Sequence, residues 1–200
     1  MASLGSFLLL IAFVICSYAV VISVVGARRR SRALIESGIG AFYLIAAVMT
    51  VASAVMVNAF LTDDFTIKYV AHYSDSVQPL FYKITSYWGG LDGSIMFWVF
   101  LLSIFGSIAV YVNRESHREL IPYVVATISA VEMFFLYLMV VHKNPFETYL
   151  TTAPADGQGL NPLLQYPEMV IHPPMLYLGY VGFTIPFAFA LGALMMRYPG

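Results

Sequence analysis

Four histidines and one acid in an apolar segment are the side chains of this sequence best suited to bind a metal or transfer a proton. His172 precedes two consecutive prolines in "EMVIHPPMLYLGYVGF", just before a long apolar run. A residue before proline favours extended geometry and proline is tolerated in the first turn of a helix, so Pro173 and Pro174 are expected to start a transmembrane helix. His172 is then held at the membrane rim, where a neutral imidazole nitrogen can bind a metal or accept a proton. The same pattern also allows a histidine that only hydrogen-bonds a loop carbonyl.

The other histidines and the single cysteine have ordinary explanations. His72 lies in a loop without a special backbone constraint, and His117 lies among charged residues where it is expected to be solvated. His142 ends a predicted helix, where it can bond the terminal carbonyls. Cys16 lies within an apolar run, so neither a CxxC pair nor a zinc site is predicted, and the residue is interpreted as a small buried hydrophobe.

Glu132 lies in the middle of an apolar segment, and carboxyl groups within membranes are costly enough to be functional candidates by default. We expect it to be protonated or paired with a hydroxyl such as that of Ser53 or Ser103, or with a group outside this sequence. It also supports an alternative function, a proton- or ion-coupled transporter subunit with Glu132 as the coupling carboxyl. The predicted helices contain few other strongly polar groups and no pair of broken half-helices, which disfavours that alternative.

The composition predicts an all-α integral membrane protein. Hydrophobic residues make up 60% of the chain and charged residues 10%, and the mean hydropathy is +0.80. A membrane-spanning helix needs roughly 20 apolar residues. Five runs satisfy this requirement: residues 6–25, 39–61, 94–112, 121–141 and 175–196.

The basic residues orient these five predicted helices. Seven of the ten lysines and arginines fall in the segments that join the first to the second and the third to the fourth helix, or directly after the fifth: Arg28, Arg29, Arg30, Arg32, Arg114, Arg118 and Arg197. The positive-inside rule places these segments and the C-terminus in the cytoplasm and the N-terminus outside. The outer loops, residues 62–93 and 142–173, are long enough to be functional. The sequence has no run of charges beyond these orienting arginines, so nucleic-acid binding is disfavoured.

Both outer loops are expected to be ordered. The first is rich in aromatic residues, which favour the membrane interface, and "YSDSVQP" around Asp75 and Pro79 predicts a break between two short elements. The second is rich in turn-forming residues, yet "LNPLLQYPEMVI" is apolar enough to pack against the helices.

Three sequence blocks carry a family resemblance: "DDFTIKYVAHYSDSVQPLFYKITSYWGGLDGSIMFW", "NPF" and "DGQGLNPLLQYPEMVIHPPMLYLGYVGFTIPFAFALGAL". In order and spacing the sequence resembles the N-terminal part of the CcmF/NrfE family of cytochrome c-type biogenesis proteins, over nearly the whole of residues 1–200. Where many relatives read "WGGHEGS", this chain has "WGGLDGS", so Leu91 removes an imidazole from that place.

This resemblance implies a haem lyase component of System I cytochrome c maturation, in the cell inner membrane, whose functional loops lie on the periplasmic side. Its implied partners are a CcmE-like haem chaperone, apocytochrome c and CcmH- or CcmI-like maturation subunits. The motif "HPPMLYLGYVGF" implies that His172 is an axial ligand of the haem iron. The family's tryptophan-rich segment, its second outer histidine and its haem b histidines come later than residue 200, so lyase activity is expected only from a larger protein or complex. A structural scaffold that recruits partners through the aromatic loop is a third hypothesis, and it would tolerate loss of His172.

Overall fold

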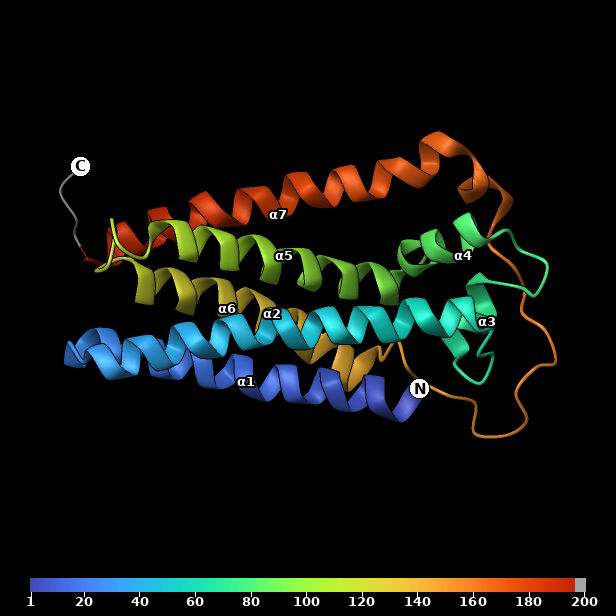
Figure 1. The fold of residues 1–200 in the computed structure, drawn as a ribbon, viewed down its shortest axis with the longest axis horizontal. Coiled ribbons are helices and arrows are strands. Elements are labelled where there is room, and N and C mark those ends of the chain that lie inside the picture. Colours follow the sequence, from blue (N-terminus) through green and yellow to red (C-terminus); the bar gives the residue numbers. More distant parts are fainter. Residues whose placement is uncertain (197–200) are drawn as a thin grey trace.

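Five long apolar helices run side by side in the computed structural model, which describes residues 1–196 (Figure 1). They are α1 (Ala2–Arg29), α2 (Arg32–Leu61), α5 (Leu91–Asn113), α6 (Ile121–Tyr137, continued by the π turn η2, Leu138–His142) and α7 (Pro167–Met196). Short helices α3 (Lys68–Tyr73), α4 (Leu80–Thr85), η1 (Ser86–Trp88) and η3 (Pro162–Gln165) lie in the two long connections. Within residues 1–196 there is no strand beyond a single antiparallel bridge. The prediction of an all-α protein with five apolar spans is confirmed.

The start of α7 is where the sequence prediction was wrong. The helix begins at Pro167 and continues through Pro173 and Pro174, so His172 lies on a helix and not on an extended segment before one. Each proline lacks the N–H that would bond the carbonyl one turn earlier. The carbonyl that Pro174 leaves unbonded belongs to Val170, and the indole N–H of Trp88 donates to it at 3.2 Å. The Trp88 indole thus replaces a backbone hydrogen bond that α7 lacks because of Pro174.

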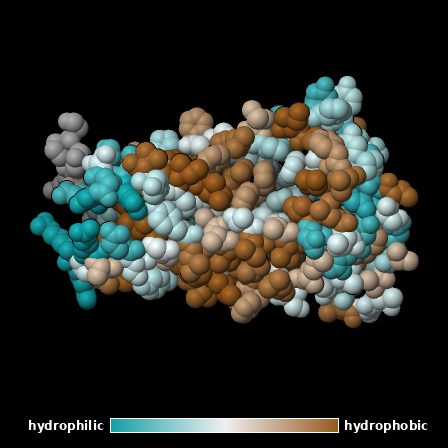
Figure 2. Space-filling view, viewed as in Figure 1, coloured by the Kyte–Doolittle hydropathy of each residue, from teal (hydrophilic) through white to brown (hydrophobic). Residues whose placement is uncertain are grey.

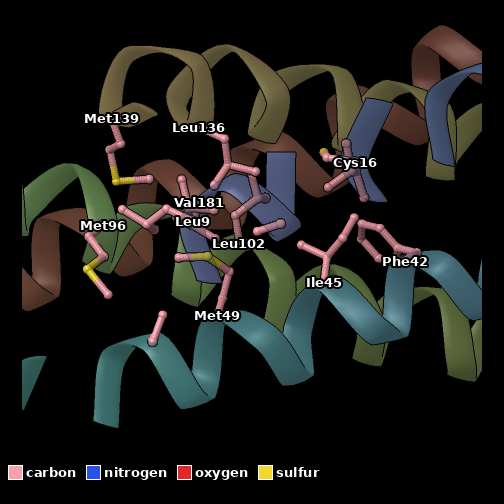
Figure 3. Close-up of a cluster of buried hydrophobic side chains, with 14 of the residues drawn as sticks. Leu9, Cys16, Phe42, Ile45, Met49, Met96, Leu102, Leu136, Met139 and Val181 are labelled. Atoms are coloured by element: carbon pink, nitrogen blue, oxygen red, sulfur yellow. The ribbon is translucent and has the colours of Figure 1, made fainter. Parts of the chain in front are cut away.

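The interior of the bundle depends on small residues of α1. Its buried positions recur every three or four residues, and they are Gly5, Leu9, Ala12, Cys16, Ala19, Ser23 and Gly26. Small side chains let helix backbones approach closely, which is the usual basis of helix association in membranes. Larger side chains then fill the centre, with Phe42, Ile45 and Met49 of α2 facing Leu102 of α5 and Leu136 of α6 (Figure 3).

The surface divides into three zones along the bundle. Hydrophobic side chains dominate the middle and hydrophilic ones gather at both ends (Figure 2). The arginines of the α1–α2 and α5–α6 connections lie together at the end opposite the long loops (Figure 1). Arg197, which the sequence analysis grouped with them, lies outside the described residues. The bundle therefore has an apolar middle between two polar ends, and its described arginines are concentrated at one of these ends.

Gly93, in the first turn of α5, lies against the long loops and is the best place to test this packing. A Cβ at this position would overlap the Tyr87 carbonyl oxygen and the Tyr69 hydroxyl, and the carbonyl belongs to the backbone and cannot swing away. Gly93→Ala is expected to lower the free energy of unfolding by about 1–3 kcal/mol, the usual cost of overpacking.

The measurement is the thermal unfolding midpoint of the detergent-purified protein. Gly40→Ala in α2 is the matched control, because a Cβ there meets nothing within 4 Å. This control should leave the midpoint unchanged or raise it, since alanine favours helix over glycine. Equal midpoints for the two variants would contradict the packing.

Candidate functional site

The two long loops fold together into one unit at the end of the bundle away from the arginines. We name this unit, residues 62–90 and 143–166, the cap. Its first half contains α3, α4 and η1, and its second half contains η3. The break between α3 and α4 falls at residues 74–79, where the two short elements were expected to separate.

Backbone and charge contacts join the two halves near the bundle. The Lys68 N–H donates to the Glu147 carbonyl at 2.8 Å, and the two side chains form an ion pair. Beside them, Ile67 and Thr148 form the antiparallel bridge. These contacts tie the start of α3 to the chain that leaves α6.

A second set of contacts joins the halves farther out. Asp156 accepts hydrogen bonds from the Ser76 N–H at 2.9 Å and the Ser76 hydroxyl at 2.7 Å, and these bonds lower the pKa of the Asp156 carboxyl. The buried side chain of Gln78 accepts from the Leu160 N–H at 3.1 Å and donates to the Ser86 hydroxyl at 2.9 Å. A buried amide with both ends bonded specifies one arrangement of the segments around it.

Tyr87 anchors the cap on a membrane helix, and other buried groups hold the first half of the cap together. The Tyr87 hydroxyl bonds the Ser53 hydroxyl of α2 at 2.7 Å. The Tyr69 hydroxyl accepts from the Gly90 N–H at 2.9 Å, and burial raises the pKa of Tyr69 well above its ordinary value. Lys83, itself buried, contacts both carboxylate oxygens of Asp63 at 2.6 Å.

The second half of the cap is fixed on α1. Phe146 is 1% exposed and its ring occupies the space left by Gly5. Next to it, the Asn144 amide donates to the Ser6 hydroxyl at 2.9 Å. The cap therefore contacts both α1 and α2, and these contacts define its position relative to the bundle.

Trp88 connects this cap to α7. Its indole donates to the Val170 carbonyl and its rings stack on Phe97 of α5 with centroids 5.3 Å apart. Phe97 in turn meets Tyr177 of α7 edge-on at 5.9 Å. One turn farther along, Tyr180 stacks on Trp98 at 5.7 Å. An aromatic seam thus joins α5 to the half of α7 that follows His172.

His172 is exposed on the first half of α7, and its ring makes no hydrogen bond to any of residues 1–196. Its neighbours one turn away on the helix are three exposed apolar residues, Met169, Met175 and Leu176, and the exposed acid Glu168. The adjacent cavity, lined by Trp88 and Met169 among others, measures about 20 Å³ and is too small for any cofactor. The structure thus offers an accessible imidazole on a mostly apolar edge, and the cavity beside it in the described part of the chain is too small for haem.

The other histidines are not brought together with this site by any recorded contact. His72 bonds the Lys68 carbonyl of its own helix at 2.6 Å, and the ring of His142 lies edge-on to Tyr137. His117 lies at the arginine end against Phe189 of α7. Among residues 1–196, no cluster of three histidines, cysteines or acids could hold a metal ion.

Glu132 is fully buried, and the two hydroxyls named as its expected partners were wrong, while a partner outside this sequence stays a prediction. Ser53 bonds Tyr87 and Ser103 bonds the Phe100 carbonyl, so neither hydroxyl is directed to the carboxyl. The nearest recorded partner is Cys16 of α1, whose sulfur is 3.9 Å from Oε2. Sequence reasoning missed this contact because Cys16 and Glu132 lie on different helices whose relative rotation is set by packing.

Comparisons with known proteins decide the family. The model of the family described as "Cytochrome C assembly protein" matches residues 88–199, more than half of the chain. This chain belongs to the cytochrome c assembly protein family. It is 34% identical to the cytochrome c-type biogenesis protein NrfE of Haemophilus influenzae over 96% of this chain and 30% of that protein. It is 38% identical to the cytochrome c-type biogenesis protein CcmF of Escherichia coli over 84% of this chain and 26% of that protein.

A solved structure has the same fold. "Cytochrome c Heme Lyase CcmF" superposes with a TM-score of 0.84 at 23% identity, covering 98% of this chain and 31% of that one. The chain thus spans under a third of the length of the relatives it matches. The suspected resemblance to CcmF and NrfE is confirmed, and the fold extends through almost all of the chain.

The lowered pKa of Asp156 makes the outer part of the cap sensitive to acid. The pKa of Asp156 is about 3.8 in the unfolded chain and lower in the folded protein. The bonds to Ser76 therefore stabilise the cap fully above pH 3.8, and this stabilisation is lost as the pH falls through the pKa of the folded state. The Gly157 N–H also donates to the Asp156 carboxyl at 2.8 Å. Amide hydrogen exchange at Ser76 and Gly157, corrected for its intrinsic pH dependence, should therefore accelerate below pH 3.8. Asp156→Asn should exchange faster at neutral pH and lose this pH dependence. Glu119→Gln, at the opposite end, should behave as wild type, and an identical profile for Asp156→Asn would refute the account.

The bond from Trp88 to Val170 can be tested by removing the donor alone. Trp88→Phe keeps an aromatic ring but leaves a buried carbonyl unbonded, which should cost about 1–3 kcal/mol locally. Hydrogen exchange across residues 167–173 should accelerate accordingly. Trp98→Phe is the matched control, because the Trp98 indole N–H has no partner among the described residues. If Trp88→Phe and Trp98→Phe accelerate exchange in residues 167–173 equally, the hydrogen bond from Trp88 to the Val170 carbonyl does not stabilise this segment.

Proposed function

We propose that this chain is the N-terminal transmembrane portion of a cytochrome c maturation protein that binds haem at the outer face of the membrane and supports its covalent attachment to apocytochrome c. The observation that carries the proposal is the exposed imidazole of His172 on an apolar edge that the cap holds in place. Membership of the cytochrome c assembly protein family supports the same role. Haem is a substrate in this scheme, received from one partner and delivered to another.

The side chains around His172 suit one part of a haem site. An imidazole nitrogen is a common axial ligand, and the apolar neighbours Met169, Met175 and Leu176 match the porphyrin face. The cavity beside His172 in residues 1–196 measures only about 20 Å³, so we expect the opposite wall and the second ligand to come from other segments. The relatives are more than three times as long as this chain, so the remaining segments of a longer protein are the natural source.

The role of His172 in this proposal is binding and orientation. A ligand on a helix loses less conformational entropy on binding than one on a flexible loop, so fixing the imidazole favours capture of haem. No side chain near His172 is assigned to catalysis, because the new bonds join cysteine thiols of the cytochrome to haem vinyl groups. The lyase activity would therefore belong to the larger protein or complex.

The charge distribution supports an orientation in the cell inner membrane. All the described arginines lie at one end of the bundle, and the positive-inside rule assigns that end to the cytoplasm. The cap, His172 and the N-terminus then lie on the periplasmic side. A CcmE-like haem chaperone, apocytochrome c and CcmH- or CcmI-like subunits would approach from that side.

The transporter alternative gains no support from the surroundings of Glu132. The carboxyl is fully buried, and Glu132 does not line the cleft of about 680 Å³ at the arginine end of the described residues. A coupling carboxyl needs access to ions or protons from both sides of the membrane in turn. The scaffold alternative makes a different prediction from haem binding, because a scaffold would not depend on His172.

The decisive variant for this proposal is His172→Gly in the complete protein loaded by its haem chaperone. The Soret absorption of bound haem and the yield of mature cytochrome c should both fall by about tenfold or more. Removing a residue that only hydrogen-bonds a metal ligand already lowers metal affinity by about tenfold, and loss of the ligand itself should cost at least as much. Added imidazole should restore the Soret band, because it supplies the missing ligand without a covalent link to the chain.

His72→Gly is the matched control, since this exposed histidine of the cap already bonds its own helix. It should leave both readouts near wild type. Unchanged haem capture and maturation in His172→Gly would assign His172 a structural role and favour the scaffold hypothesis.

A further inference from the structure

A cleft of about 680 Å³ opens at the end of the bundle opposite the cap. Its walls come from the α1–α2 connection, the start of α2, the α5–α6 connection, the start of α6 and the last turn of the described part of α7. The haem proposal assigns nothing to this end. Hydrophilic side chains gather at this end of the bundle, beyond the apolar middle (Figure 2), and the ends of helices of this length lie at the depth of lipid headgroups.

Four arginines line this cleft: Arg30, Arg32, Arg114 and Arg118. Three glutamates line it too, so the lining is positive by one charge, and Arg28 and Arg29 add two more beside it. Within residues 1–196, Arg30 forms no ion pair. Its backbone has a φ of 51°, a left-handed conformation usually taken by glycine at the end of a helix. An arginine at such a position is unusual, and it lies with three other arginines around one cleft.

The existing ion pairs leave the arginines available to a stronger anion. Arg32 lies 3.9 Å from Glu36 and Arg114 lies 4.0 Å from Glu115, while Arg118 forms a closer, hydrogen-bonded ion pair with the same Glu115. All five of these side chains are at least 45% exposed. Exposed pairs of this kind contribute little to stability. A phosphate accepts paired hydrogen bonds from guanidinium groups and can replace such contacts.

Next to the arginines the cleft has an apolar wall. Ile35 and Ile39 of α2 and Met195 and Met196 of α7 line it, and Ile39 is 8% exposed. A free phosphate or a nucleotide would leave these side chains uncovered. A phospholipid matches both parts, because its phosphate suits the guanidinium groups and its acyl chain suits the isoleucines and methionines.

We propose that this cleft is a binding site for an anionic phospholipid. The phosphate is held by Arg30, Arg114 and Arg118, and an acyl chain lies along Ile35 and Ile39. Basic pockets between transmembrane helices are the recognised places for such headgroups. The site is independent of haem binding and stabilises the junction of the α1–α2 and α5–α6 connections.

Native mass spectrometry of the complete protein with added cardiolipin tests this proposal, with phosphatidylethanolamine as the zwitterionic comparison. Wild type should retain cardiolipin preferentially, and Arg114→Gln/Arg118→Gln should weaken retention by about tenfold or more. Arg28→Gln/Arg29→Gln is the matched control, because it removes the same charge from the same end but does not alter the cleft lining. This control should retain cardiolipin within about twofold of wild type.

Three results would overturn the proposal. Equal losses in the two double variants would show attraction to general surface charge, and no preference for cardiolipin over phosphatidylethanolamine would show a site without charge selection. Displacement of cardiolipin from wild type by an equal concentration of inorganic phosphate would assign the cleft to free phosphate. If Arg114→Gln/Arg118→Gln does not fold, Arg30→Gln carries the same test without disturbing an ion pair, and unchanged retention there would also count against the site.

Discussion

The hydrogen bond from the Trp88 indole to the Val170 carbonyl is the interaction on which the arrangement of the site depends. Two consecutive prolines would normally end a helix or begin one. The bond from Trp88 satisfies one of the carbonyls that they leave unbonded, so α7 extends back to Pro167. His172 consequently lies on a helix of defined direction, and the same tryptophan fixes that helix to the cap.

Further contacts of the cap fix the position of the whole end of the molecule that contains His172. Tyr87 bonds α2, Phe146 packs on α1, and Gln78 joins the two halves of the cap to each other. Long connections on membrane proteins are often mobile, but these are closed by buried polar groups whose partners lie far away in the sequence. A partner protein that approaches His172 would therefore meet a preformed surface, which lowers the entropic cost of association.

Much of this architecture could be predicted from the sequence, and the errors have one cause. The five apolar spans and the break between α3 and α4 depend on local composition and turn residues, which act over a few positions. The start of α7 and the surroundings of Glu132 depend on Trp88 and Cys16, partners that only the fold brings near. His172 was found through its neighbouring prolines, although its backbone is helical and not extended as those prolines suggested.

The central claim is that a helical His172, held by the cap, presents its imidazole to haem iron. Cryo-electron microscopy of the complete protein with haem delivered by its chaperone tests that claim most directly. The account predicts continuous density between the His172 ring and the iron, with α7 helical from Pro167 and Trp88 still against Val170. Iron bound by other side chains, with the His172 ring directed away from it, would contradict the account.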